Sequence, residues 1–324
     1  MANEINTIGV LTSGGDAPGM NAAIRAVVRS ALAKGKKVKG IMRGYQGMLE
    51  EEIIDMDEHS VSDIIQRGGT ILGTARCMEF VTPEGQQMGA DICRRHGIDG
   101  LVVIGGDGSF RGAQKLAHLG INTIGVPGTI DLDIACTDYT IGFDTAVNTA
   151  MDAIDKVRDT STSHERCSII EVMGRHAGYI ALWCGIANGA EDILLPERYN
   201  HDEQKLINHI IDSRKKGKKH HIIINAEGIG HSASMAKRIE AATGMETRAT
   251  ILGHMQRGGS PTCKDRMYAS IMGAYAVDLL CDGKSNRVVA YQGGDYVDFE
   301  IDEALAMKKD VSEYQYNVSK ILSR

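Results

Sequence analysis

The sequence is poor in the features that mark membrane, secreted and nucleic-acid-binding proteins. Its 324 residues include only five prolines, four phenylalanines and one tryptophan. No apolar run approaches the roughly 20 residues of a membrane span. The first residues lack the basic-then-apolar order of a signal peptide, so we expect a cytoplasmic protein without a membrane partner. A net charge of −6 argues against nucleic acid as the main partner.

Paired cysteines are also absent. The seven cysteines are an odd number and none belongs to a Cys-x-x-Cys pair, so neither a zinc site nor a disulfide framework is indicated. We expect reduced thiols in the protein core.

Strand-like and helical stretches alternate along the chain, which predicts βαβ units and parallel sheets. Strands are expected at residues 8–12, 38–42, 99–105, 121–127, 167–172 and 221–225, and helices at 19–33, 177–187 and 203–215. No Ser- or Pro-rich linker marks a boundary. The predicted fold is α/β, with two Rossmann-like, three-layer α/β/α lobes of mainly parallel sheets. We expect the chain to cross between the lobes more than once and the active site to lie in the cleft between them.

Two glycine-rich loops follow predicted strands, at residues 13–19 and 105–109. The second leads toward a helix start at residues 114–117, so its backbone N–H groups are expected to form an anion cradle. Asp107 within this loop is a candidate Mg²⁺ ligand. Neither loop is a Walker A motif or a dinucleotide-binding Gly-x-Gly-x-x-Gly motif.

Asp131 and Asp133 lie one residue apart in a glycine-led turn at residues 127–133. Phosphoryl transfer needs a phosphate cradle, metal-assisted charge stabilisation and an acid that orients or deprotonates the attacking hydroxyl. Arg76, which follows the Gly68-Gly69 turn, is a candidate clamp for the transferred group.

Further arginines stand at residues 163–166, 173–176, 248 and 254–259, in three cases beside glycine or histidine, and Glu227-Gly228 adds a carboxylate. A sugar phosphate would need such guanidinium forks and one carboxylate for its hydroxyls. Taken alone, the run at 215–220 and the pair Arg25 and Arg29 are typical of solvated surfaces.

Together these motifs resemble the bacterial ATP-dependent 6-phosphofructokinases along essentially the whole chain. The carriers are residues 11–16, 67–70, 103–109, 127–131, 145–158, 163–166, 173–176 and 252–261. The resemblance implies phosphorylation of fructose 6-phosphate to fructose 1,6-bisphosphate in glycolysis, with ATP as co-substrate and Mg²⁺ as cofactor. It also implies an ATP-binding lobe at residues 1–142 plus 256–306. A sugar-phosphate-binding lobe would comprise 143–255 plus 307–324.

The resemblance assigns roles to individual residues. Asp131 would be the general base, Asp107 the Mg²⁺ carboxylate and Asp133 its electrostatic support. The other catalytic residues would be Arg76, Thr129 and Arg175. The ATP site would comprise Gly15, Tyr45, Arg76, Cys77, Gly106, Asp107, Gly108 and Ser109. The sugar-phosphate site would comprise Thr129, Ile130, Asp131, Arg166, Met173, Gly174, Arg175, Glu227, Arg248, His254, Met255, Gln256 and Arg257.

Two further implications concern assembly and regulation. Arg166 and Arg248 match residues that the family supplies from a neighbouring subunit, which implies a homotetramer with shared active sites. An effector site for ADP or phosphoenolpyruvate would comprise Arg25, Arg29, Arg158, Gly189, Ala190, Glu191, Lys216, Lys218, Lys219 and His220.

The sequence departs from the family pattern at three positions. Glu58 stands where some members have an effector-binding arginine, and Lys216 stands where arginine is usual, which weakens the expected effector response. Leu132 stands where asparagine commonly separates the two aspartates, but both carboxylates remain and we expect activity to survive.

The sequence leaves three alternatives. A pyrophosphate-dependent phosphofructokinase is disfavoured because such relatives carry Asp at the position of Gly108 and Lys at that of Gly128. Lipid and NAD kinases share the glycine loop but lack the acid pair and the arginine set. A catalytically inactive effector-binding subunit would not need Asp107, Asp131, Arg76 and Arg175 together.

Overall fold

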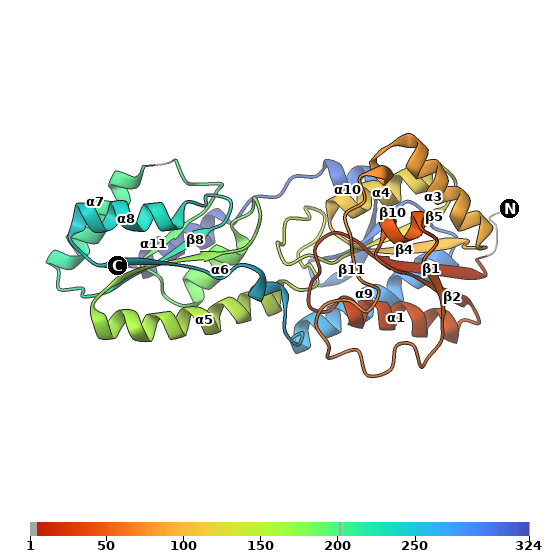
Figure 1. The fold of residues 1–324 in the computed structure, drawn as a ribbon, viewed down its shortest axis with the longest axis horizontal. Coiled ribbons are helices and arrows are strands. Elements are labelled where there is room, and N and C mark those ends of the chain that lie inside the picture. The colour runs from red at the N-terminus through yellow and green to blue at the C-terminus, as the bar shows by residue number, and fades with distance from the viewer. Residues whose placement is uncertain (1–4, 201, 324) are drawn as a thin grey trace. The chain divides into compact units, whose positions relative to one another are not determined.

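The computed structural model describes residues 5–200 and 202–323 (Figure 1). These residues fall into two compact units. The first contains the described chain through Ile130, then Ile134–Thr145 and Arg257–Lys309. The second contains Asp131–Asp133, the described part of Ala146–Gln256 and the described chain from Asp310 onward. The chain therefore passes from one unit to the other repeatedly.

The first unit is built on a seven-stranded, mainly parallel sheet. Its strand order is β11-β10-β5-β4-β1-β2-β3, and only the edge strands β11 and β3 are antiparallel to their neighbours. The bounds are β1 Thr7–Thr12, β2 Lys37–Ile41, β3 Ile53–Met56, β4 Gly100–Gly105, β5 Asn122–Pro127, β10 Arg287–Gln292 and β11 Asp295–Glu300. Every residue of β1 and β4 is buried, as expected for parallel strands covered on both faces.

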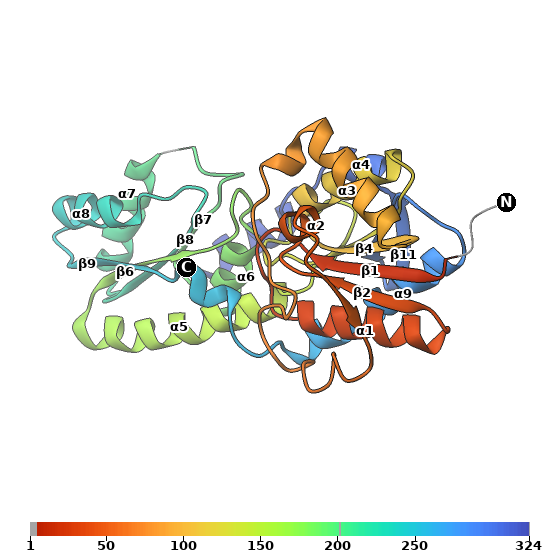
Figure 2. The same ribbon diagram turned by 45° about the vertical axis from the view of Figure 1, so that its right-hand side comes forward.

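Helices cover both faces of this sheet. Figures 1 and 2 show α1 (Met20–Ala33) and α9 (Cys263–Cys281) together on one face. On the other face lie α3 (Pro83–Arg95), α4 (Asp107–His118) and α10 (Ile301–Ala306). The first unit also contains the short helix α2 (Tyr45–Leu49) and the 3₁₀ turn Glu79–Val81, and the 3₁₀ turn Gly253–Arg257 lies where the chain returns from the second unit to the first. The unit is thus a three-layer α/β/α structure.

The second unit is built on a four-stranded parallel sheet. Its order is β7-β8-β6-β9, with β7 Asp192–Leu194, β8 His221–Ala226, β6 Cys167–Val172 and β9 Thr247–Ile251. The other helices are α5 Phe143–His164, α6 Tyr179–Ala187, α7 Glu203–Lys215, α8 Ser232–Thr243 and α11 Glu313–Leu322. Figure 1 shows α7 and α8 on the side of the sheet opposite α5.

Successive side chains of β6 point to opposite faces of the sheet, and each face is covered by different helices. Cys167 and Ile169 pack into an apolar core with Ile210 of α7 and Ile239 of α8. Ser168, between them, faces the other way, and its hydroxyl lies 2.6 Å from that of Ser161 on α5. A period of two therefore places successive side chains in different layers.

The predicted α/β class and mainly parallel sheets are confirmed, but one boundary was wrong. The helix expected to start near residue 114 begins at Asp107, because Gly106 is its extended N-cap and the glycine at 108 is tolerated in the first turn. The expectation of core thiols fails at Cys263, which is exposed. None of the described helices combines the length and apolarity needed to cross a bilayer.

Candidate functional site

Three loops meet at the carboxyl ends of neighbouring strands in the first unit. The Ser13 N–H after β1 donates to the Ile104 carbonyl at 3.0 Å, and the Gly128 N–H after β5 donates to the Gly105 carbonyl at 2.9 Å. A Cβ on Gly105 would lie 2.5 Å from the Ser13 carbonyl oxygen, so this approach requires glycine. In open parallel sheets such an edge is where ligands bind.

Helix α4 begins at this edge with the predicted metal-binding carboxylate in its first turn. Asp107 is the first residue of the helix and is half-buried. The N-terminus of a helix offers backbone N–H groups and the positive end of the helix dipole, which favours phosphate. Oxygen ligands of this kind suit Mg²⁺, which usually takes one or two carboxylates and completes its shell with water and substrate phosphates.

The two glycines used to judge the phosphoryl donor differ in their surroundings. A Cβ on Gly108 would meet no atom within 4 Å, and the residue is exposed. A Cβ on Gly128 would lie 3.0 Å from Ile104 Cγ2 and 3.2 Å from Met20 Cε. Position 108 therefore has room for a side chain, whereas a side chain at position 128 requires Ile104 and Met20 to shift by a few tenths of an ångström.

Tyr45, predicted to belong to the ATP site, is buried beneath the second glycine loop. Its hydroxyl donates to the Ser109 carbonyl at 2.6 Å, and its ring stacks on Phe80 with centroids 4.1 Å apart. Burial raises the pKa of Tyr45 far above the usual value. Tyr45 thus supports the loop from below, whereas Arg76 is exposed and Cys77 is half-buried against the core.

Arg257 lies against the first glycine loop. Its Nη1 donates to the Asp16 carbonyl at 3.1 Å, and a Cβ on Gly15 would lie 2.6 Å from that nitrogen. The family resemblance placed Arg257 among the sugar-phosphate residues, but in the structure Arg257 contacts the loop that is predicted to bind ATP.

The acid pair lies in a turn with an unusual backbone. Asp131 is buried, Asp133 is half-buried, and Leu132 between them has a φ of +57°. A left-handed conformation costs a non-glycine residue about 1 kcal/mol and is best tolerated by asparagine or aspartate. The leucine therefore keeps the turn with some strain, and its side chain is buried. Thr129 and Ile130, just before the turn, are buried as well.

In the second unit, several predicted sugar-phosphate residues meet at the carboxyl ends of β6 and β8. The N–H groups of Gly174 and Arg175 donate to one carboxylate oxygen of Glu227, at 3.2 and 2.5 Å. The Met173 N–H donates to Gln256 Oε1 at 3.4 Å. Glu227 thus fixes the turn that carries Arg175, whose φ is +56° and whose side chain is exposed. His254 and Met255 are also exposed.

Arg166 and Arg248 share a partner that the sequence analysis missed. Arg166 Nε lies 2.7 Å from Glu246 Oε2, and Arg248 Nη2 lies 2.8 Å from Glu246 Oε1. Hydrogen bonds from Arg166 and then Arg248 lower the pKa of Glu246. The spacing Glu246-Thr247-Arg248 was the available signal for Arg248, since residues two apart in an extended segment share a face, but no local signal linked Glu246 to Arg166.

Part of the predicted effector set also clusters in the second unit. Glu191 accepts from the Ile222 N–H at 2.6 Å and pairs with Lys218 at 2.5 Å. Arg158 donates to the Asn188 carbonyl just before this turn. Burial lowers the pKa of His220; Arg158 and Lys218 act in the same direction, and Glu191 opposes them.

The remaining effector residues are placed differently. Lys219 pairs with Glu165 at 2.8 Å instead of joining the cluster. Lys216 is exposed at the end of α7. Gly189 is exposed with a φ of +60°, and Ala190 is buried. Arg25 and Arg29 lie on α1 of the first unit, half-buried and exposed, and Glu58 is exposed in that unit.

Known proteins that this chain resembles both in sequence and in structure carry the same family name. The chain is 61% identical over 321 residues to an ATP-dependent 6-phosphofructokinase of Clostridium botulinum (strain Loch Maree / Type A3), covering 99% of this chain and 100% of the relative. Among solved structures, phosphofructokinase from Saccharomyces cerevisiae matches with a TM-score of 0.87 and 34% identity. That match covers 98% of this chain and 48% of the yeast chain, so this chain spans about half of it.

A second solved structure bears on the fold alone. A pyrophosphate-dependent phosphofructokinase from Marinobacter aquaeolei matches with a TM-score of 0.85 and 24% identity, covering 96% of this chain and 86% of that chain. The fold is therefore shared with a protein named for another donor. The family model described as Phosphofructokinase matches residues 7–280. As the motifs predicted, the chain belongs to the phosphofructokinase family.

Proposed function

We propose that this chain is an ATP-dependent 6-phosphofructokinase, which transfers the terminal phosphoryl group of ATP to the 1-hydroxyl of fructose 6-phosphate in glycolysis. The observation that carries the proposal is the meeting of three strand-end loops beside Asp107 at the N-terminus of α4, in a chain 61% identical to relatives of that name. A cytoplasmic location accords with this reaction.

The first unit would bind ATP. The loops around Gly15 and Gly106–Ser109 would hold the phosphates through backbone N–H groups, because glycines keep the backbone accessible and the α4 dipole favours anions. Asp107 would hold Mg²⁺, for which a carboxylate among phosphate-binding loops is suited. When bound, Mg²⁺ supplies neutralisation of the phosphate charge. Arg76, which is exposed, would contact the transferred group.

Asp131 would be the general base that accepts the proton of the sugar 1-hydroxyl. Burial of the carboxylate suits this role, because a buried group is positioned by packing and shielded from bulk water. Thr129 and Arg175 would assist in the same step, by positioning and by charge stabilisation. Asp133 would add electrostatic support.

The second unit would bind fructose 6-phosphate. Glu227 holds the 173–175 turn through one carboxylate oxygen, which leaves its other oxygen as a candidate acceptor for a sugar hydroxyl. Arg166 and Arg248 would bind the sugar phosphate of a neighbouring subunit's site, in a homotetramer. ADP or phosphoenolpyruvate would act at the cluster of Arg158, Glu191, Lys218 and His220.

ATP is favoured over pyrophosphate as the donor because position 108 is open. With no side chain at 108, the space beside the α4 N-terminus stays available to an additional phosphate. An aspartate there would place a negative charge in that space. Relatives at 61% identity are named as ATP-dependent, which supports the same choice.

The test is a coupled assay of the purified chain. Fructose 6-phosphate is offered with Mg-ATP or with Mg-pyrophosphate, and fructose 1,6-bisphosphate formation is followed through aldolase and a dehydrogenase. We expect turnover with ATP and at least a hundredfold less with pyrophosphate. Turnover with pyrophosphate alone would reverse the donor assignment, and turnover with neither would contradict the proposed reaction.

A further inference from the structure

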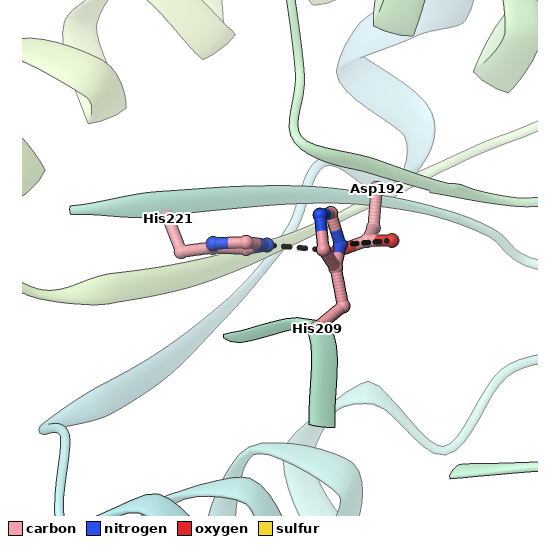
Figure 3. Close-up of side chains that lie close together, drawn as sticks. All are labelled: Asp192, His209 and His221. Atoms are coloured by element: carbon pink, nitrogen blue, oxygen red, sulfur yellow. Dashed lines mark hydrogen bonds and ion pairs between the residues drawn. The ribbon is translucent and has the colours of Figure 1, made fainter. Parts of the chain in front are cut away.

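Three side chains of the types that bind metal ions, none of them assigned to the reaction, converge in the second unit (Figure 3). His209 Nδ1 lies 2.9 Å from Asp192 Oδ2, and His221 Nε2 lies 2.8 Å from the same oxygen. All three donor atoms lie within 4.8 Å of one another. In residues 5–200 and 202–323, no other trio of His, Cys, Asp or Glu side chains is arranged to hold an ion in this way.

The fold explains why residues so far apart in sequence meet. Asp192 begins β7 and pairs in register with Ile223 of β8, so His221, two residues earlier on β8, lies close by. His209 projects from α7, which covers the same face of the sheet. Each ligand therefore comes from a different element, and the sequence offers no local spacing that would reveal the cluster.

We propose that Asp192, His209 and His221 form a binding site for a divalent transition-metal ion, of which Zn²⁺ is the representative. Two imidazoles and one carboxylate are the three-ligand set of zinc sites that keep a fourth position for water or another ligand. Imidazole nitrogens suit Zn²⁺, Ni²⁺ and Cu²⁺, whereas Mg²⁺ prefers oxygen ligands. The site is therefore chemically separate from the proposed Mg²⁺ carboxylate.

Both histidines need only a small shift from Asp192, and their own nitrogens lie within 4.8 Å of each other. Tetrahedral bonds of about 2.0–2.1 Å separate ligand atoms by roughly 3.3 Å, so the observed 2.8 and 2.9 Å separations need to open by about half an ångström. The His221 side chain is 2% exposed, Asp192 22% and His209 36%. The cluster is thus anchored inside, and the half-exposed His209 side gives an ion its path of entry.

An occupied site would join α7 to β7 and β8 next to the predicted effector cluster. Glu191 directly precedes Asp192, and His220 directly precedes His221. The ammonium of Lys218, the nearby cation, is already paired with Glu191 and so opposes a bound cation less than a lone charge would.

The experiment uses the full chain without a tag, stripped of metal, in a Cys263→Ser background that removes the exposed thiol. Zn²⁺ affinity is measured by competition with a chromophoric chelator, and Co²⁺ binding by its visible absorption bands. We expect one Zn²⁺ per chain with a micromolar or lower Kd, and tetrahedral-type Co²⁺ bands.

Three variants decide the assignment. His209→Gln and Asp192→Asn should each weaken Zn²⁺ binding roughly tenfold or more. The matched control is His96→Gln, which removes a histidine that also faces a carboxylate, Glu51 at 2.8 Å, but without a second imidazole. It should leave the affinity unchanged.

Absence of stoichiometric binding by the parent chain would overturn the site and leave a His–Asp–His hydrogen-bond network. Zn²⁺ affinities in all three variants equal to that of the parent chain would also overturn the site. Because His209 is half-exposed on a helix, its replacement should preserve the fold, which circular dichroism checks. If the Asp192→Asn variant unfolds, the Co²⁺ spectrum of the parent chain and the Zn²⁺ affinity of His209→Gln still test the proposed site.

Discussion

The guanidinium of Arg166 forms a 2.7 Å ion pair with one carboxylate oxygen of Glu246, and Arg248 pairs with the other oxygen of the same carboxylate. Arg166 is only 19% exposed, whereas Arg248 is 64% exposed. One carboxylate therefore fixes a nearly buried arginine and tethers an exposed one. Both arginines are proposed to bind the sugar phosphate, so Glu246 becomes a positioning residue for that substrate.

Replacing Glu246 by Ala should raise the KM for fructose 6-phosphate about fivefold and leave kcat nearly unchanged, because a partly exposed ion pair contributes up to about 1 kcal/mol of ordering. Steady-state kinetics with saturating ATP measures both constants. The control is Glu203→Ala, which breaks the Glu203–Arg238 pair elsewhere in the unit. A lower kcat with an unchanged KM would contradict the positioning role.

Asp131→Asn and Asp131→Ser should lower kcat by about 10²–10⁴-fold with little change in substrate affinity, since each removes a general base. Leu132→Asn is the matched neighbour. It should keep most of the activity, because asparagine accepts the left-handed backbone observed there. An Asp131 variant that retained more than about a third of the parent kcat would remove the assignment.

Gly108→Asp should impair the use of ATP through a higher KM or lost turnover, while thermal stability stays within about 0.5 kcal/mol because no atom meets a side chain there. Gly128→Ala should instead destabilise the fold by about 1–3 kcal/mol, through contacts with Ile104 and Met20. Kinetics and thermal melts of both variants separate the two effects. An unchanged ATP KM in Gly108→Asp would show that position 108 does not face the nucleotide.

The shared-site assembly can be tested by complementation. Arg248→Ala and Asp131→Ala chains, each nearly inactive alone, are mixed, dissociated and reassembled. Some active sites should then combine an intact Arg248 from one subunit with an intact Asp131 from another, and activity should reappear. Mixed oligomers that form, as shown by native mass spectrometry, yet stay inactive would rule out the shared-site arrangement.

Regulation is expected to be weak. Phosphoenolpyruvate should shift the apparent affinity for fructose 6-phosphate near the low end of the usual 5–150-fold range, since Glu58 and Lys216 weaken phosphate capture. Lys218→Ala and Arg25→Ala should each remove the shift, whereas Lys219→Ala should not, because Lys219 pairs with Glu165. Fructose 6-phosphate saturation curves with and without phosphoenolpyruvate measure the shift in each variant. A shift that persists in Arg25→Ala would place the effector elsewhere.

Local signals in the sequence predicted some elements well and left others unassigned, among them β10 and the long helices α5 and α9. The bounds of β6 and α7 match the structure, because an apolar strand and a helix with an Asp202 cap are specified by their own residues. The start of α4 was placed too late, because glycines at a helix N-terminus read as a loop. The antiparallel edge strands β3 and β11 were not assigned, because pairing at a sheet edge depends on distant residues.

The same limit applies to the site. Motifs identified the glycine loops and the acid pair, whose chemistry is local. Glu246, the burial of Tyr45 and the loop contact of Arg257 were missed, because each depends on a neighbour brought close only by folding. Contacts between residues that are far apart in the sequence could thus be found only from the structure.

The pairing of β5 with β10 has a consequence for synthesis on the ribosome. Pro127 ends β5, but its neighbouring strand begins only at Arg287, whereas all four strands of the other sheet are encoded by Ile251. At roughly 5–20 residues per second, the larger sheet waits on the order of ten seconds or more with one side of β5 unpaired. The sheet whose first strand is encoded first is therefore the last sheet to be completed, and the nascent chain presents an apolar strand edge in the meantime.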